Sequence, residues 1–379
     1  MWTLLIAAAL AAVPACGAEP STASVRGVHL TAWVAGSGPE RRAFLAHTEG
    51  TLINAVVVPV KESDGEVYIP GVAEAKELGT QRIAIPNPEF LVRDIKARGL
   101  RAIARVVVFK DDALARSRPQ WAVKDSRGGL WRTRGGSHWM DPYNREVWDY
   151  NLAIALAAVK DGFDEVQFDY MRFPADGDTR RCRYSRVDHS SATAVAALDE
   201  FLGEAHRRLE AAGAAMSVDV FGLTTSAHND MGIGQSLRKM ARVVDAVSPM
   251  MYPSHYAKGS YGLKDPNREP YKIVLWGLRD AKRRVGGAAR LRPYLQDFSL
   301  GYRYGPQQVR AQLRAARRQG VRSWILWNPL NRYTWSALGP WTAADDAVPA
   351  APAAQASTSA ASEPLPEGTT VQDRLEKEE

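Results

Sequence analysis

Eight short strand-like runs alternate with helical stretches along this chain, and this alternation limits the folds that it can adopt. Most of the runs are continuous in apolar residues, which is typical of parallel strands covered by helices. They occupy residues 25–33, 55–62, 101–109, 164–173, 215–221, 246–252, 291–298 and 321–327. Strand and helix in alternation predict a parallel sheet of the α/β class, and eight units favour a single closed (β/α)8 barrel, a TIM barrel, over an open doubly wound sheet.

The stretches between the runs agree with this barrel. Helices are expected at residues 88–98, 145–160, 192–212 and 307–319. Glycines of the kind that end helices precede four of the runs, at Gly99, Gly162, Gly213 and Gly320. Asp141 followed by Pro142 predicts the start of the second helix, with Asp141 as its N-cap. No glycine-rich phosphate loop follows the first run, which weakens a dinucleotide-binding alternative.

The two ends of the chain differ in composition from the barrel domain, which is predicted to span residues 24–340. Residues 1–15 are apolar, alanine-rich and short for a membrane span, so residues 1–18 are predicted to be an export signal. Val13-Pro-Ala-Cys16 resembles a bacterial lipobox and predicts lipidation of Cys16; cleavage after Ala18 is the alternative. The mature protein would then be periplasmic, anchored to the envelope or secreted. Residues 347–379, rich in Ala, Ser, Thr, Pro and Glu, are expected to be disordered.

Charge and cysteine content narrow the class of partner. The formal net charge is +7, although residues 363–379 hold six acids and two bases, so the barrel itself is more basic. This charge serves either solubility or attraction to an anionic envelope or glycan. No helix-turn-helix or basic repeat indicates nucleic-acid binding. Cys16 and Cys182 are the only cysteines, so no disulfide is expected in the mature domain.

Acidic residues gather near the C-terminal ends of the runs, where barrels of this type carry their active sites. The segment 164–174 is the most informative, because it delivers Asp169 to the end of the fourth run, followed at once by Tyr170 and Arg172. Strand alternation places Asp169 and Asp219 on the polar faces of the fourth and fifth runs, so both are predicted to point into the barrel. Acids surrounded by aromatic residues at such a mouth suggest sugar chemistry.

Glycoside hydrolysis normally needs two carboxyl groups, about 5 Å apart in retaining enzymes and roughly 6.5–9.5 Å apart in inverting ones. We expect Asp169 to be the nucleophile or electrostatic stabiliser and Asp219 the general acid/base, with Asp297 as the reserve candidate. Arg172 and Tyr170 would orient Asp169 or lower its pKa. Each aspartate alone could instead be a structural hydrogen-bond acceptor.

Aromatic, histidine and acidic residues near the predicted mouth are candidates for substrate binding, because flat apolar faces suit sugar rings. The candidates are His29, Trp33, Glu62, His138, Trp139, Tyr170, Arg172, Tyr252, His255 and Trp327. Glu62 and Asp111 are expected to shape the substrate site or cap helices. The histidines His29, His138, His189 and His255 show no close ligand spacing, so neither a metal nor another cofactor is expected.

Several motifs resemble a known family. They are Arg26-Gly-Val-His29, Val58-Pro-Val-Lys-Glu-Ser-Asp-Gly65, Arg105-Val-Val-Val-Phe-Lys-Asp111, Trp139-Met-Asp-Pro142 and Phe168-Asp-Tyr-Met-Arg-Phe-Pro174. Together they are similar to the bacterial glycoside-hydrolase-like barrels of the DUF4015 family, over residues 25–331. The resemblance implies a TIM barrel related to the α-amylase and α-galactosidase types. In those barrels an aspartate ending the fourth strand is the nucleophile, which corresponds to Asp169 here.

These observations predict an exported, monomeric O-glycoside hydrolase that acts on a polysaccharide or oligosaccharide, without cofactor and without nucleic acid as a partner. A non-catalytic glycan-binding barrel attached to the envelope is the alternative, because a fold alone does not confer activity. The carboxylates distinguish the two: a mouth with a single inward acid would favour the binding protein.

Overall fold

The computed structural model describes residues 24–287 and 290–342. The predicted export signal with Cys16 and the predicted tail at residues 347–379 lie outside the described residues.

Eight parallel strands close into one barrel, in the order β1-β10-β9-β8-β7-β5-β3-β2. The barrel strands are β1 (Arg26–His29), β2 (Ala55–Lys61), β3 (Arg101–Val107), β5 (Glu165–Asp169), β7 (Ala215–Phe221), β8 (Ala246–Met251), β9 (Tyr294–Gln296) and β10 (Trp324–Trp327). Each of the eight predicted runs contains one of these strands, and the predicted TIM barrel is confirmed.

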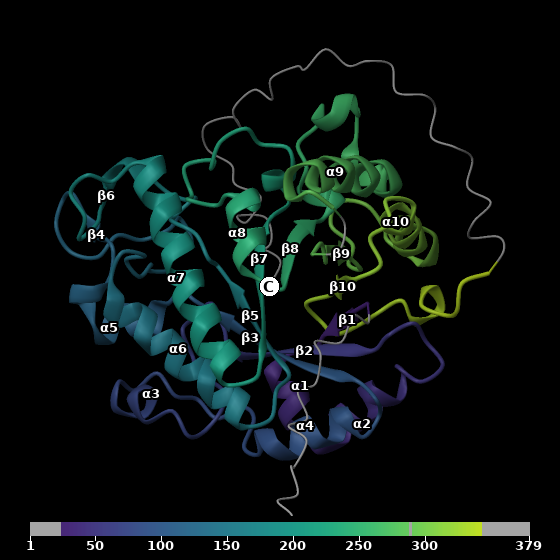
Figure 1. The fold of residues 1–379 in the computed structure, drawn as a ribbon, viewed down its shortest axis with the longest axis horizontal. Helices are drawn as coiled ribbons and strands as arrows, with labels where there is room; N and C mark the ends of the chain where they lie inside the picture. The colour runs from purple at the N-terminus through teal and green to yellow at the C-terminus, as the bar shows by residue number, and fades with distance from the viewer. Residues whose placement is uncertain (1–23, 288–289, 343–379) are drawn as a thin grey trace, which may run out of the picture.

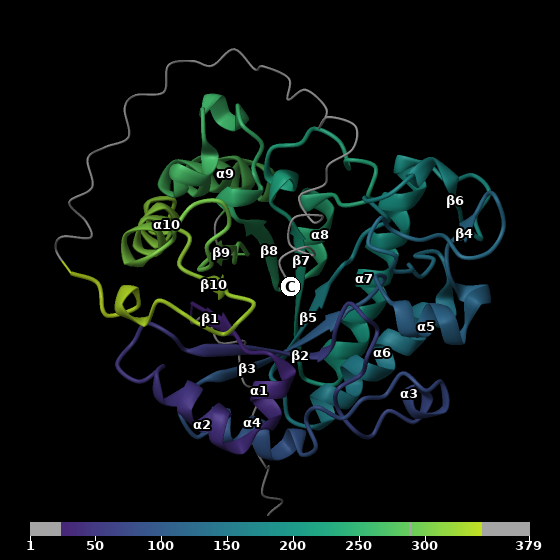
Figure 2. The same ribbon diagram turned by 180° about the vertical axis from the view of Figure 1, so that it is seen from behind.

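Helices surround the strands (Figure 1, Figure 2). They are α1 (Ala32–Gly36), α2 (Gly38–Ala46), α3 (Ala73–Glu77), α4 (Pro88–Lys96), α5 (Asp112–Ser117), α6 (Arg145–Lys160), α7 (Ser191–Ala211), α8 (Leu237–Val243), α9 (Pro270–Val285) and α10 (Pro306–Arg318). Two short strands, β4 (Lys124–Asp125) and β6 (Cys182–Arg183), pair with each other outside the barrel. Within residues 24–287 and 290–342, no helix has the length and apolarity needed to cross a membrane.

The predicted helices α4, α6, α7 and α10 are present within two residues of their expected bounds, but the predicted cap of α6 is wrong. Asn144 caps this helix, since its side chain accepts hydrogen bonds from the amides of Glu146 and Val147. Asp141 instead accepts from the amides of Tyr143 and Ser185. The residues after Asp141 form a turn before the helix begins, so the proline does not occupy its first position.

The first run also departs from its prediction, because strand β1 ends at His29 and the chain enters α1 at Ala32. Trp33 therefore lies on a short helix, with 51% of its surface exposed, and not on a strand. A short apolar segment is compatible with either a strand or a helix, so periodicity could not separate the two here.

The barrel interior below the C-terminal mouth is filled by two kinds of side chain. One is an apolar cluster made by Ala55, Val57, Ile103, Tyr252, Tyr294 and Ile325. The other is polar: Gln167 donates to Ser248 Oγ at 3.3 Å and accepts from the Tyr294 hydroxyl at 2.6 Å. Side chains thus fill the interior, as in other barrels of this type.

Candidate active site

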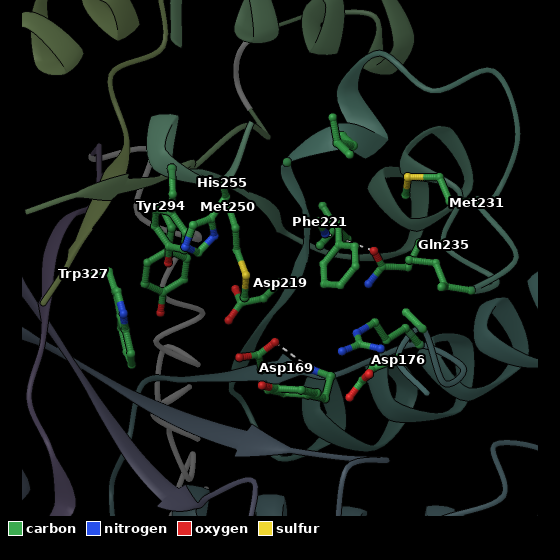
Figure 3. A pocket seen from close by; sticks show the side chains of 18 of the residues that line it. Asp169, Asp176, Asp219, Phe221, Met231, Gln235, Met250, His255, Tyr294 and Trp327 are labelled. Atoms are coloured by element: carbon green, nitrogen blue, oxygen red, sulfur yellow. Dashed lines mark hydrogen bonds between the residues drawn. The ribbon is translucent and has the colours of Figure 1, made fainter. Parts of the chain in front are cut away.

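A cavity of about 260 Å³ opens at the C-terminal mouth of the barrel (Figure 3). Seven of the residues predicted for the site line it: Asp169, Tyr170, Arg172, Asp219, Tyr252, His255 and Trp327. They come from β5, β7 and β10, and from the segments that follow β5 and β8. The mouth therefore collects polar side chains that are up to 158 residues apart in the sequence, from Asp169 to Trp327.

Asp169 ends strand β5 and is held through both of its oxygens. Oδ2 accepts from Arg105 Nε at 3.0 Å and Arg105 Nη2 at 2.6 Å, and Oδ1 accepts from the amide of Tyr170 at 2.6 Å. This last contact is drawn in Figure 3. Tyr170 has a φ of 50°, a left-handed conformation that is uncommon outside glycine. The chain thus turns sharply just after the carboxylate, as active-site residues often do.

Arg105 joins Asp169 to a second acid. Its Nη1 donates to both oxygens of Glu62, at 2.9 and 2.8 Å, while its other nitrogens contact Asp169. Burial alone would lower the pKa of this guanidinium, but the negative charges of Glu62 and Asp169 raise it well above its ordinary value. Arg105 therefore stays a fixed positive charge between the two acids.

Asp219 lies beside Asp169 but in a different electrostatic environment. Strands β5 and β7 pair through Phe168 and Val218, so the next position on each strand places the two aspartates side by side, as Figure 3 shows. Neither oxygen of Asp219 has a hydrogen-bond partner among the described residues, and the side chain is buried. Burial, followed by the negative charge of Asp169, raises the pKa of Asp219 well above its ordinary value. Asp219 therefore holds a proton at pH values where an ordinary aspartate has lost it.

Aromatic residues form the wall on one side of the two acids. Trp327, Tyr294 and His255 lie together in Figure 3, and Tyr252 packs edge-on against His255 with ring centroids 5.1 Å apart. Burial lowers the pKa of His255 to about 4, so its ring is neutral near pH 7. Its Nε2 is buried and has no hydrogen-bond partner within the part of the chain that the structure describes. This nitrogen is available to a ligand hydroxyl.

His29 supports this wall from behind without lining the cavity. Its ring centroid lies 4.3 Å from that of Trp327, and its side chain is buried. Burial, followed by the positive charge of Arg105, lowers the pKa of His29 well below its ordinary value. A neutral His29 thus packs against Trp327, which lines the cavity.

Other predicted site residues have partners of their own away from the cavity. Asp297 follows β9, and its two oxygens accept from the amide of Thr334 at 2.7 Å and from its hydroxyl at 2.6 Å. Burial raises the pKa of Asp297 to about 6. His138 contacts Asp112, with Nδ1 2.5 Å from Oδ1. Neither Asp297 nor His138 is among the residues that line the cavity.

Three further predicted binding residues lie at the edge of the site or beneath it. Trp139 is buried under Arg172, whose guanidinium lies 4.6 Å from its ring centroid, and donates to the Arg172 carbonyl. Glu62 is connected to the cavity through Arg105. Trp33 lies outside the cavity, with its ring 6.1 Å from that of Tyr68.

The sequence analysis missed Arg105, although a signal for it existed. Arg105 lies in the middle of an apolar run, at the same parity as the inward-facing Ile103, and a buried charge requires a partner. Asp111, by contrast, has one of the two roles expected of it. It caps α5 through the amide of Leu114 and forms a buried ion pair with Lys61 at 2.7 Å.

Across residues 24–287 and 290–342, no group of three or more His, Cys, Asp or Glu residues is placed to hold a metal ion.

Comparisons with solved structures agree with the barrel. The PgaB (BpsB) glycoside hydrolase domain from Bordetella bronchiseptica has a TM-score of 0.63 at 15% identity, covering 84% of this chain and 100% of that one. The α-L-fucosidase isoenzyme 2 from Paenibacillus thiaminolyticus has a TM-score of 0.57 at 14% identity, covering 83% and 48%. A hypothetical protein from Ruminiclostridium thermocellum ATCC 27405 is 34% identical, covers 51% of this chain and 97% of its own, and has a TM-score of 0.47.

The comparison with protein families identifies the family of this chain in addition to its fold. A comparison with curated protein sequences gave no match. Residues 27–333, which are more than half of the chain and nearly all of the barrel, match the family described as "Putative glycosyl hydrolase domain", DUF4015. The chain therefore belongs to the DUF4015 family of glycosyl hydrolase domains.

Proposed function

We propose that this chain is an exported O-glycoside hydrolase that cleaves a polysaccharide or oligosaccharide with Asp169 and Asp219 as its carboxylate pair. One observation carries the proposal: a buried acid with a raised pKa and no hydrogen-bond partner among the described residues lines the same cavity as an arginine-paired carboxylate. Two titratable groups whose environments differ in this way are the arrangement that divides acid and base roles in glycosidases.

Asp219 is the proton donor in this scheme. Glycosidic oxygen is a poor leaving group unless it receives a proton as the bond breaks, and a carboxylic acid with a raised pKa supplies that proton near neutral pH. Burial, followed by the negative charge of Asp169, raises the pKa of Asp219 well above its ordinary value. Its two unpartnered oxygens leave the acid free to face the glycosidic oxygen.

Asp169 acts on the sugar carbon. Arg105 and the amide of Tyr170 fix its orientation, so the carboxylate can attack the anomeric carbon or stabilise the positive charge that develops there. The two carboxyl groups come from neighbouring positions on paired strands, so they can act on opposite sides of one glycosidic bond.

The aromatic side of the cavity is the place for the sugar ring. Trp327 offers a flat face, while His255 Nε2 lacks a partner among the described residues and can bind a hydroxyl. The fold shared with a glycoside hydrolase domain and an α-L-fucosidase supports the reaction class, but identities of 14–15% transfer no particular sugar.

Export is part of the proposal on sequence grounds. The apolar residues 1–15 and the lipobox-like Val13 to Cys16 favour a mature protein in the periplasm, on the envelope through a lipid on Cys16, or outside the cell. A glycan of the cell envelope or its surroundings is the partner that this location offers to a monomeric barrel.

A glycan screen tests the proposal. Purified protein is incubated with bacterial and plant polysaccharides, and new reducing ends are counted, with Asp169→Asn as the matched control. We expect at least one glycan to be cleaved by the wild type and not by the variant. Tight binding of a glycan without cleavage would overturn the hydrolase and leave the glycan-binding barrel in its place.

A further inference from the structure

The cavity has two unlike ends, with Asp169 and Asp219 between them (Figure 3). Trp327, Tyr294 and His255 lie at one end, and Phe221, Met231 and Gln235 lie at the other. The second end, called here the apolar end, is walled by Phe221, Leu223, Met231 and Ile233. Phe221 ends β7, Leu223 follows in a short 3-10 turn, and the other two come from the loop between that turn and α8.

The polar side chains at the apolar end are already engaged within the protein. Gln235 accepts from the amide of Phe221 at 3.0 Å and donates to the carbonyl of Met171 at 3.2 Å. The guanidinium of Arg172 lies 4.6 Å from the Phe221 ring centroid and donates to the carbonyl of Phe173. Sugar hydroxyls placed here would lose their water without gaining an equivalent partner.

Asp176 also lines this end, and it too is engaged. Its Oδ2 accepts from the amide of Arg134 at 3.3 Å, and its Oδ1 lies 3.8 Å from Arg134 Nε. What the apolar end offers a ligand is therefore mainly hydrocarbon surface.

The loop that carries Met231 and Ile233 is fixed by a buried carboxylate. Asp230 accepts from the Ser191 hydroxyl at 2.6 Å and from the amide of Gly234 at 2.9 Å. The amide of Phe173 in turn donates to the carbonyl of Ile233 at 2.9 Å. These bonds tie the loop to α7 and to the segment after β5, so the apolar wall is part of the folded site.

We propose that the apolar end takes an aryl or alkyl group on the leaving portion of the glycoside. The inference rests on the proposed glycosidase function for the roles of the two ends, since the aromatic end with its free polar atoms suits the sugar. Among the substrates proposed above, it selects an oligosaccharide that is joined to an apolar aglycone, in which the scissile oxygen lies between the last sugar and the hydrocarbon at the two aspartates.

A binding experiment tests the apolar end without relying on catalysis. The probes are 1-propanol, 1-butanol, 1-pentanol and 1-hexanol, titrated into the full chain by calorimetry. We expect affinity to rise about fourfold per methylene, equivalent to about 0.8 kcal/mol for each buried CH₂. Leu223→Asn and Met231→Gln should both flatten this dependence. Val187→Asn, a similar change at a fully exposed position, should leave it intact. Equal affinities for the four alkanols would overturn the proposal. A dependence of affinity on chain length that neither cavity variant reduces would also overturn it.

A turnover experiment separates this inference from the glycosidase proposal. Ethyl and hexyl glycosides of the sugar found in the glycan screen have leaving groups of nearly equal acidity, so the chemical step is matched. We expect kcat/KM for the hexyl glycoside to exceed that for the ethyl glycoside by more than tenfold, and Leu223→Asn to remove the difference. Cleavage of both glycosides at equal rates would refute the apolar aglycone and leave the hydrolase intact. Chain-length-dependent alkanol binding with no cleavage of any glycoside would support the apolar end and refute the hydrolase.

Discussion

Replacing Arg105 with glutamine should both destabilise the barrel and change its pH profile, because this one cation serves two acids. Arg105 donates to Asp169 at 2.6 and 3.0 Å and to Glu62 at 2.8 and 2.9 Å, and only 5% of its surface is exposed. Removing one member of a buried ion pair typically costs 3–5 kcal/mol, since the remaining charge is left buried without a partner.

The magnitude expected here is at the lower end of that range. The side chain of Glu62 is 29% exposed, so water can solvate it once the arginine is gone, whereas that of Asp169 is 5% exposed and cannot be rescued in this way. We therefore expect Arg105→Gln to lower the free energy of unfolding by about 3 kcal/mol. This free energy is measured by denaturant titration, with circular dichroism as the signal. Arg322→Gln, at an exposed position, is the control and should change it by less than about 0.5 kcal/mol.

The same variant should move the alkaline limb of the activity profile to higher pH. The positive charge of Arg105 opposes the raised pKa of Asp219, so without Arg105 the proposed acid keeps its proton to a higher pH. Arg105→Lys keeps the charge but not the paired geometry, and should restore part of the pH profile with a lower kcat. An Arg105→Gln protein that unfolds at the wild-type denaturant concentration and keeps the wild-type profile would refute the reasoning.

The remaining predictions concern the two aspartates and the N-terminus. Asp169→Asn should keep the fold and glycan affinity but lower turnover by about 10³-fold or more, roughly 4 kcal/mol, in initial-rate assays; activity within a few-fold of wild type would contradict its role. Asp219→Asn should lower the turnover of glycosides with good leaving groups less than that of natural ones. Equal losses of turnover for both kinds of substrate would show that Asp219 is not the acid. Because the folded-state pKa of Asp219 is raised, the wild-type protein loses stability as the pH rises through that value, so Asp219→Asn should be the more stable protein at alkaline pH in thermal unfolding. Intact-mass analysis of protein from the native host should show residues 1–15 removed; an unprocessed N-terminus would end the export proposal.

The barrel itself was predictable because it depends on short-range pattern. Eight apolar strands alternate with helical segments, and this alternation excludes most other architectures. The pairing of Asp169 with Asp219 followed from the same pattern, since strand parity and the order of neighbouring strands place both side chains at one mouth. These parts of the site are consequences of the fold.

The parts of the site that could not be predicted depend on where irregular segments go. Asp297 follows β9 at odd spacing from the inward-facing Tyr294, so it turns to Thr334 and not to the cavity. Trp139 pairs with Lys110 in an isolated bridge, which buries it beneath Arg172. Met231 reaches the cavity only because Asp230 fixes its loop. No periodicity in the sequence encodes these loop paths.

The contrast between two buried acids in one barrel gives the strongest reason to assign chemistry to Asp219. Glu165, also fully buried, contacts Arg292 and Arg101 and accepts from the Ser217 hydroxyl. Although burial alone would raise the pKa of Glu165, these partners, Arg292 foremost, lower it below its ordinary value. Glu165 therefore has the surroundings of a carboxylate that stabilises the fold.

Asp219 lies on the neighbouring strand but forms no hydrogen bond with any described residue, and the positive charges of Arg105 and Arg292 lower its pKa by less than burial and Asp169 raise it. Leaving a buried polar group without a hydrogen bond lowers the stability of the fold by about 1–3 kcal/mol. A buried acid also lowers it at high pH, where it must lose its proton, whereas an amide or an apolar side chain of similar size does not titrate. None of the hydrogen bonds of the fold depends on an acid at this position. The acid would instead serve a ligand that needs a proton at the barrel mouth, as the glycosidic oxygen proposed above would.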